Sequence, residues 1–103
     1  MLRHATLDDI PALLAIERQC FTTDRLSRRS FRHLLTRGNA VTLLDENEGR
    51  IRGYVLLLFS RGTSMARLYS IAVHPEYGRR GVGDRLLEEA EAAALERDCV
   101  SMR

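Results

Sequence analysis

The sequence predicts a mixed α/β fold, with a mostly antiparallel sheet that carries helices on both faces. Three observations lead to this fold class. Two stretches with a helical spacing of apolar residues come early in the chain, and three strand-like stretches separated by turns follow them. A further helical stretch then lies between two strand-like stretches. The two strands of such a crossover should be parallel, and the crossover connection should be right-handed. We therefore expect the order β-α-α-β-β-β-α-β in one domain, residues 1–103.

The first third of the chain predicts a short strand and two helices. Residues 2–5 alternate apolar and polar side chains, which is typical of a strand. Thr6 begins the capping pattern Thr-x-x-Asp, so we expect a helix from about Leu7 to Cys20. Ser27 is a suitable N-cap for a second helix, and Gly38 is suited to end it. The apolar faces are Ile10, Leu13, Leu14, Ile16 and Cys20 in the first helix, and Phe31, Leu34 and Leu35 in the second.

The middle of the chain predicts a meander of three strands separated by turns. Residues 39–46 and 50–61 are the first two predicted strands, and the turn Asn47–Gly49 joins them into a hairpin. A second turn leads into the third strand, residues 65–73, which ends before Pro75. These three strands should be antiparallel to one another.

A third helix is predicted from about Gly83 to Arg97, and residues 99–103 resemble the opening of another strand. Glutamates on this helix are expected to be mostly solvated, namely Glu88, Glu89, Glu91 and Glu96. The expected core face of the same helix consists of Leu86, Leu87, Ala90, Ala93 and Ala94.

Composition and charge exclude some classes of function. The net charge of +2 is too small to indicate nucleic acid by itself, although all 16 basic residues are arginine. The longest apolar run, YVLLLF, is far too short to span a bilayer, so no membrane association is expected. The arginines from Arg25 to Arg37 form a basic segment without an aromatic stacking platform. A solvated helix face, an acidic acceptor and the 3′-phosphate of a nucleotide cofactor stay open as interpretations of this segment.

The two cysteines predict free thiols. Cys20 and Cys99 lie in unrelated contexts with neither metal-ligand nor redox spacing, and no metal site is expected. Both occupy apolar faces, where a thiol behaves as a small hydrophobic side chain. Free thiols fit a reducing compartment, and the N-terminal residues lack the apolar segment of a signal peptide. We therefore expect a cytoplasmic protein.

A glycine-rich loop, GRRGVG at residues 78–83, directly precedes the third helix. It fits neither the dinucleotide-binding fingerprint, because Leu86 replaces the third glycine, nor a P-loop, because Asp84 and Arg85 replace Lys and Ser/Thr. Glycines nevertheless allow a ligand to approach the backbone closely, and the first turn of a helix attracts anions. Phosphate binding and a plain strand-to-helix turn stay open at this point.

A resemblance favours the first of these interpretations. The stretch LYSIAVHPEYGRRGVGDRLLEEAE, residues 68–91, resembles motif A of the GNAT superfamily of acyl-CoA N-acyltransferases. In that motif a strand ends in an apolar triplet, a loop [Q/R]-x-x-G-x-[G/A] follows, and then a helix. Gly78 stands where the family usually has Gln or Arg. The order of elements is also GNAT-like, and the first two helices are similar to the branch that acetylates protein N-termini, including ribosomal-protein alanines.

The resemblance implies a cofactor site for acetyl-CoA (coenzyme A) on the third meander strand and the loop. Backbone groups of Ile71, Ala72 and Val73 would pair with the pantetheine arm, and an N–H near Val73 would polarise the thioester carbonyl. The pyrophosphate would lie on the backbone of the loop and the first helical turn: Arg79, Arg80, Gly81, Val82, Gly83 and Asp84. The negative charge of Asp84 does not suit a phosphate site. In the alternative interpretation, Asp84 caps the helix or pairs with an arginine.

Other residues near this site have weaker claims to a role. Strand alternation would send one of Tyr69 and Ser70 to the acceptor side. His74 has the chemistry of a base, but a histidine in a surface turn is the simpler interpretation. Cys20 is expected to be a core thiol, because no residue in the sequence is placed to activate it.

The resemblance covers the front part of the family fold, so we expect a domain that is incomplete at its C-terminus. Family members commonly carry a Glu on the fifth strand that orders a base-acting water, and a Tyr on the next helix that protonates the thiolate. No catalytic residue is therefore assigned. An open sheet edge at residues 99–103 would favour self-association or a homodimer.

Three functions of different classes follow from these observations. The first is an acetyl-CoA-dependent N-acetyltransferase, or the cofactor-binding part of one, whose acceptor is a peptide N-terminus or a small amine attacked without a covalent acyl-enzyme. The second is a CoA-binding module without catalysis. The third is a small basic domain that binds RNA or an acidic protein, and the glycine loop argues against it.

Overall fold

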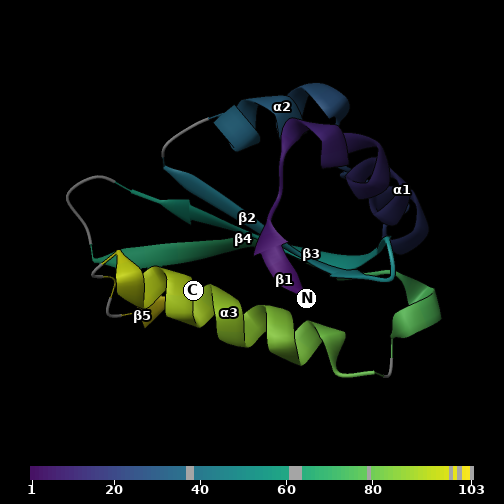
Figure 1. Cartoon of the computed structure of the whole chain (residues 1–103). Helices are drawn as coiled ribbons and strands as arrows, with labels where there is room; N and C mark the ends of the chain where they lie inside the picture. Colours follow the sequence, from purple (N-terminus) through teal and green to yellow (C-terminus); the bar gives the residue numbers. More distant parts are fainter. Residues whose placement is uncertain (37–38, 61–63, 79, 98, 100, 103) are drawn as a thin grey trace.

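A five-stranded mixed sheet forms the centre of the computed structural model (Figure 1), which describes residues 1–36, 39–60, 64–78, 80–97, 99 and, by backbone alone, 101–102. The strands lie in chain order, and β1 to β4 are antiparallel. The last strand runs parallel to β4, as expected for two strands joined by a helical crossover. The bounds are β1 Leu2–His4, β2 Ala40–Asn47, β3 Arg50–Phe59, β4 Met65–Val73 and β5 Ser101–Met102.

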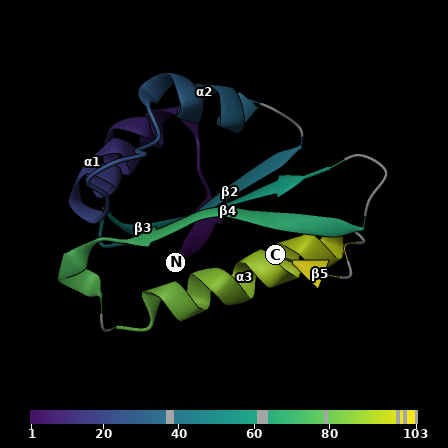
Figure 2. The same cartoon turned by 180° about the vertical axis from the view of Figure 1, so that it is seen from behind.

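Helices cover both faces of this sheet, which confirms the predicted fold class. Figures 1 and 2 show α1 and α2 on one face and α3 on the other. The helices are α1 Ile10–Cys20, α2 Arg28–Thr36 and α3 Val82–Glu96, and short 3₁₀ turns are η1 Leu7–Asp9 and η2 Pro75–Tyr77.

The residues predicted to cap the first two helices, Thr6 and Ser27, form hydrogen bonds at the helix starts, with one correction at the first helix. Its predicted start at Leu7 is a 3₁₀ turn, and the α-helix begins three residues later. The tighter turn lets the Asp9 carboxylate accept hydrogen bonds from the Thr6 amide at 2.7 Å and from the Arg3 guanidinium at 2.8 and 2.9 Å. At the second helix, Ser27 Oγ accepts from the Ser30 amide at 3.1 Å. The predicted ending at Gly38 lies outside the described residues.

The core consists of one apolar layer on each side of β3. Alternate side chains of this strand, such as Tyr54 and Val55, point to opposite faces, which explains why its sequence is a continuous apolar run. The layer under α1 and α2 contains Ile10, Leu13, Ile16, Phe31, Leu44, Tyr54, Leu56 and Ala72. The layer over α3 contains Val41, Leu43, Val55, Leu57, Phe59, Ala66, Val82, Leu86, Ala90, Ala94 and Cys99.

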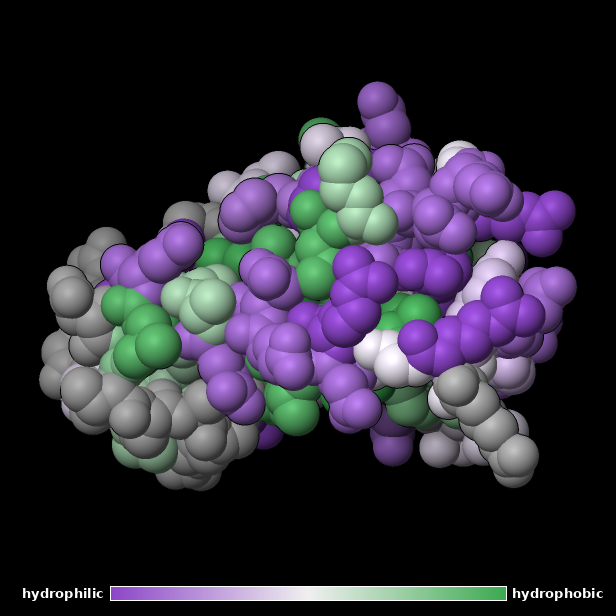
Figure 3. All heavy atoms as spheres, turned by 60° about the horizontal axis from the view of Figure 1, so that its bottom comes forward, coloured by the Kyte–Doolittle hydropathy of each residue, from purple (hydrophilic) through white to green (hydrophobic). Residues whose placement is uncertain are grey.

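The outer face of α3 is hydrophilic, as expected. Seen from that side, hydrophilic side chains cover most of the described surface and hydrophobic ones form separate patches (Figure 3). The exposed side chains of the helix include Glu88, Glu89, Glu91 and Glu96. Within the described residues, each helix is too short or too polar to cross a bilayer.

Candidate active site

One edge of β4 has backbone groups that no described strand pairs beyond its first two residues. The parallel neighbour β5 pairs only with Met65 and Ala66. On the other edge, the His74 amide donates to the Arg52 carbonyl at 2.8 Å, and the same register pairs Ala72 with Tyr54. Because hydrogen-bonding direction alternates along an antiparallel pair, Ala72 directs its backbone groups toward β3. Its two neighbours in sequence direct theirs toward the open edge.

This alternation distinguishes the three strand residues expected at the cofactor site. Ile71 and Val73 present N–H groups to the open edge, so each could pair with an extended ligand that lies along it. Ala72 is buried, and its backbone groups face the sheet interior. For all three residues, contact with a cofactor stays a prediction.

The glycine loop brings the first turn of α3 close to the end of β4. Gly81 has a φ of 74°, a left-handed conformation that favours glycine, and it caps the helix without a side-chain hydrogen bond. The first intrahelical bond runs from the Arg85 amide to the Gly81 carbonyl at 3.1 Å. The amides of Val82, Gly83 and Asp84 therefore begin the helix without an intrahelical acceptor, which is the geometry that binds anions.

The other loop residues expected at the cofactor site have distinct surroundings. Arg80 is exposed, and its guanidinium lies 5.6 Å from the centroid of the Tyr77 ring. Asp84 is exposed in the first turn of α3, where a carboxylate is favourable to the helix dipole. Val82 buries its side chain in the core under the helix. Arg79 lies outside the described residues.

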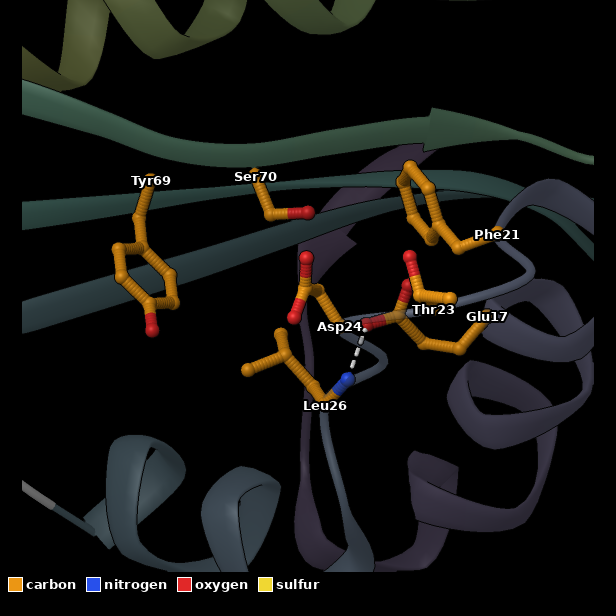
Figure 4. Close-up of a pocket in the computed structure, with 7 residues that line it drawn as sticks. All are labelled: Glu17, Phe21, Thr23, Asp24, Leu26, Tyr69 and Ser70. Atoms are coloured by element: carbon orange, nitrogen blue, oxygen red, sulfur yellow. Dashed lines mark hydrogen bonds between the residues drawn. The ribbon is translucent and has the colours of Figure 1, made fainter.

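A cavity of about 520 Å³ lies beside β4 on the face of the sheet that α1 and α2 cover. Its walls come from α1, the segment between α1 and α2, and β4 (Figure 4). The lining residues are Glu17, Phe21, Thr23, Asp24, Leu26, Tyr69 and Ser70.

Tyr69 and Ser70 both line this cavity, so the strict alternation of side chains expected at these two positions is not observed. The physical reason is a bulge in β4. Leu56 pairs with Ser70 and the next residue of β3, Leu57, pairs with Leu68, which leaves Tyr69 as an extra residue. A bulge interrupts the alternation of side chains and re-aims them locally.

The Ser70 hydroxyl is held by a buried phenol. Its Oγ lies 2.8 Å from the hydroxyl of Tyr54, which is fully buried and packs edge-on against the Phe31 ring. Burial raises the pKa of Tyr54 well above its usual value, despite the hydrogen bond to Ser70. Tyr54 therefore stays protonated at neutral pH and positions Ser70 by a neutral hydrogen bond.

Glu17 is a buried acid in the cavity wall, outside the motif of residues 68–91. It is 1% exposed, and its Oε1 accepts a hydrogen bond from the Leu26 amide at 2.8 Å. Its Oε2 is buried with no hydrogen-bond partner among the described residues. The sequence contains an indication that Glu17 is buried. It follows Leu13 by four residues, so it lies on the apolar face of α1.

The histidine and the thiols near the site are used structurally. His74 Nδ1 accepts from the Glu76 amide at 3.2 Å and caps the 3₁₀ turn. Cys20 Sγ donates to the Val73 carbonyl at 3.2 Å, and burial raises the pKa of this thiol. Cys99 is buried in the core, as predicted. Within the described part of the chain, no three His, Cys, Asp or Glu side chains form a cluster that could hold a metal ion.

The described arginines of the basic segment are exposed. Arg25 donates to two backbone carbonyls, those of Phe21 at 2.6 Å and Arg18 at 3.4 Å. The others that the structure describes are Arg28, Arg29 and Arg32. Exposure fits the solvated helix face among the open interpretations.

The fold and the strand–loop–helix geometry agree with one protein family. A model of the acetyltransferase (GNAT) family matches residues 10–102. The chain therefore belongs to this family, and the resemblance of residues 68–91 to its motif A is confirmed at the level of the family.

Individual relatives share the same domain in longer chains. An amino-acid acetyltransferase of Pasteurella multocida is 36% identical over 93 residues, which is 90% of this chain and 21% of that protein. The chain thus spans about a fifth of the length of the curated relatives it matches.

Two solved structures show the same fold at lower identity. The ribosomal-protein-S18-alanine N-acetyltransferase from Escherichia coli is 22% identical with a TM-score of 0.87, covering 99% of this chain and 63% of that one. The PaiA N-acetyltransferase from Thermoplasma acidophilum, in complex with coenzyme A, is 17% identical with a TM-score of 0.86, covering 96% and 74%.

Proposed function

We propose that this chain forms the acetyl-CoA-binding part of an N-acetyltransferase that acetylates a primary amine. The observation that carries the proposal is the open edge of β4, which ends beside the amides of α3 that have no intrahelical acceptor, in a chain of the GNAT family. A solved structure with this fold is in complex with coenzyme A, which supports the choice of cofactor.

In this proposal, the chain contributes binding and polarisation through its backbone. The N–H group of Ile71 pairs with the pantetheine arm, and the Val73 N–H donates to the thioester carbonyl oxygen. The amides of Val82, Gly83 and Asp84 bind the pyrophosphate, with Gly81 allowing its close approach, and Arg79 and Arg80 add positive charge. Acetyl-CoA supplies an activated acyl group: the amine nitrogen forms a bond to the carbonyl carbon, the C–S bond breaks, and a proton passes from the amine to the sulfur.

A glycine substitution tests the cofactor site. In Gly83→Val the new Cβ would meet Val73 Cγ2 at 3.6 Å, an ordinary contact. We expect a loss of at least tenfold in affinity for acetyl-CoA, or about 1.4 kcal/mol, measured by calorimetry. The matched control is Ala92→Val on the exposed face of the same helix, which should leave the affinity unchanged.

Equal affinity in Gly83→Val and the parent would contradict the proposed cofactor site. A turnover assay with a mixture of primary amines separates an acetyltransferase from a CoA-binding module, because only the former releases free thiol in proportion to acetylated amine. A cytoplasmic location and self-association stay predictions beside this proposal.

A further inference from the structure

One wall of the cavity beside β4 contains a buried acceptor atom that forms no hydrogen bond with any described residue. Glu17 Oε1 is bound by the Leu26 amide, whereas Oε2 is buried and without a partner among the described residues. Figure 4 shows this second oxygen turned away from the Leu26 amide. Burying a carboxylate oxygen without a hydrogen bond or a counter-charge is costly, so a donor from outside the chain would stabilise it.

A second acid lines the same cavity, and neither acid is paired with a described basic residue. Asp24 lines it, and neither Asp24 nor Glu17 forms an ion pair with any described residue. The nearby Arg25 is bound to two backbone carbonyls at the end of α1. Arg67 lies with its guanidinium 5.8 Å from the centroid of the Tyr69 ring. The described residues that line the cavity therefore include two acids, Glu17 and Asp24, and no basic residue.

We infer that this cavity binds the protonated amino group of an acceptor that has no carboxylate beside that amine, with Glu17 and Asp24 as its counter-ions. The ammonium group has three N–H donors, and the acidic and hydroxyl residues that line the cavity to accept them are Glu17, Asp24 and Ser70. Ser70 directly precedes Ile71 on β4, so an amine bound here lies next to the strand edge proposed to bind the cofactor. The inference rests on that proposed function.

The charge of the cavity separates two kinds of acceptor. A free amino acid carries its carboxylate on the carbon that bears the amine, so this carboxylate would lie within a few ångströms of Glu17 and Asp24 and be repelled. A peptide N-terminus has a neutral carbonyl at the same place, and a polyamine has a methylene group. We therefore expect this chain to differ in acceptor from its relatives named amino-acid acetyltransferase.

Acceptor binding can be measured without turnover, on the protein saturated with CoA, which has no acetyl group to transfer. The probes are a tripeptide amide that begins with alanine, spermidine, L-alanine and L-glutamate, titrated by calorimetry. We expect the tripeptide amide, spermidine or both to bind at least tenfold more tightly than either free amino acid. The first two probes distinguish a peptide N-terminus from a polyamine as the source of the ammonium.

Two charge-neutral variants assign the selectivity to the cavity. Asp24→Asn, at an exposed loop position, and Glu17→Gln, which keeps an oxygen for the Leu26 amide, should each lower that selectivity by at least fivefold. The matched controls are Asp8→Asn and Glu89→Gln, exposed acids on other elements, which should leave it unchanged.

Three outcomes decide between the proposals. Absence of CoA binding would overturn the proposed function, and the acceptor titrations on the free protein would then test the cavity alone. Normal CoA binding with free amino acids bound as tightly as the amide and spermidine would overturn only the present inference. Unchanged selectivity in folded Asp24→Asn and Glu17→Gln would overturn the assignment to these two acids.

Discussion

Replacement of Gly53 should disturb both the packing of the core and the candidate site. Gly53 pairs with Val73 in the sheet, and a Cβ built on it would lie 2.8 Å from the Ala72 carbonyl oxygen and 3.1 Å from Leu86 Cδ1. The first of these atoms is backbone and cannot turn away, so Gly53→Ala must push β3 from β4 or displace α3. The same displacement would move the open edge at Val73.

The magnitude follows from the cost of overpacking. Adding a methyl group to a well-packed position costs about 1–3 kcal/mol. One kcal/mol lowers Tm by roughly 4–8 °C in a domain of about this size. We therefore expect Gly53→Ala to lower Tm by about 8–16 °C if the cost is near 2 kcal/mol, and to weaken acetyl-CoA binding in addition.

Thermal unfolding followed by calorimetry or circular dichroism measures this effect. The control is Gly49→Ala in the β2–β3 turn, where a Cβ would meet nothing within 4 Å but φ is +78°. A left-handed conformation costs a non-glycine residue about 1–2 kcal/mol, so this control measures backbone strain without crowding. If the Tm of Gly53→Ala stayed within about 2 °C of the parent value, the reasoning from close packing would be wrong.

Two further predictions concern an ion pair and the thiols. Arg3 lowers the pKa of the Asp9 carboxyl by hydrogen bonds at 2.8 and 2.9 Å, so this pair stabilises the fold above the ordinary pKa of about 3.9 and loses its effect as pH falls through the lower folded value. Arg3→Met should therefore melt below the parent near pH 7, with a difference that shrinks below about pH 4; an equal difference at both pH values would contradict this. Replacing Cys20 and Cys99 by alanine should leave acetyl transfer in place, because the Cys20 thiol has a raised pKa and donates its proton to a carbonyl. A folded double variant without transfer, together with an acetyl-thioester trapped on the parent, would refute direct attack by the amine.

The order of elements and most of their ends could be predicted from the sequence because they depend on local interactions. The period of apolar residues changes from helical to strand-like after residue 38, and the caps at Thr6 and Ser27 act within three residues of themselves. The turn Asn47–Gly49 forms as predicted, with positive φ at Glu48 and Gly49. Likewise, the glycine loop and the family motif are contiguous, so the candidate cofactor site could be located along the chain.

The tertiary structure alone decided the features that depend on residues far apart in the sequence. The bulge at Tyr69 is defined by the register between two strands, and it places both Tyr69 and Ser70 in the cavity. In the sequence, Glu17 is a polar residue on an otherwise apolar helix face. In the fold, α1, β4 and the segment that carries Asp24 form the walls of a cavity that Glu17 lines. Local periodicity states which face of an element is buried, whereas a cavity and its unpaired charge arise from the spaces that several packed elements leave between them.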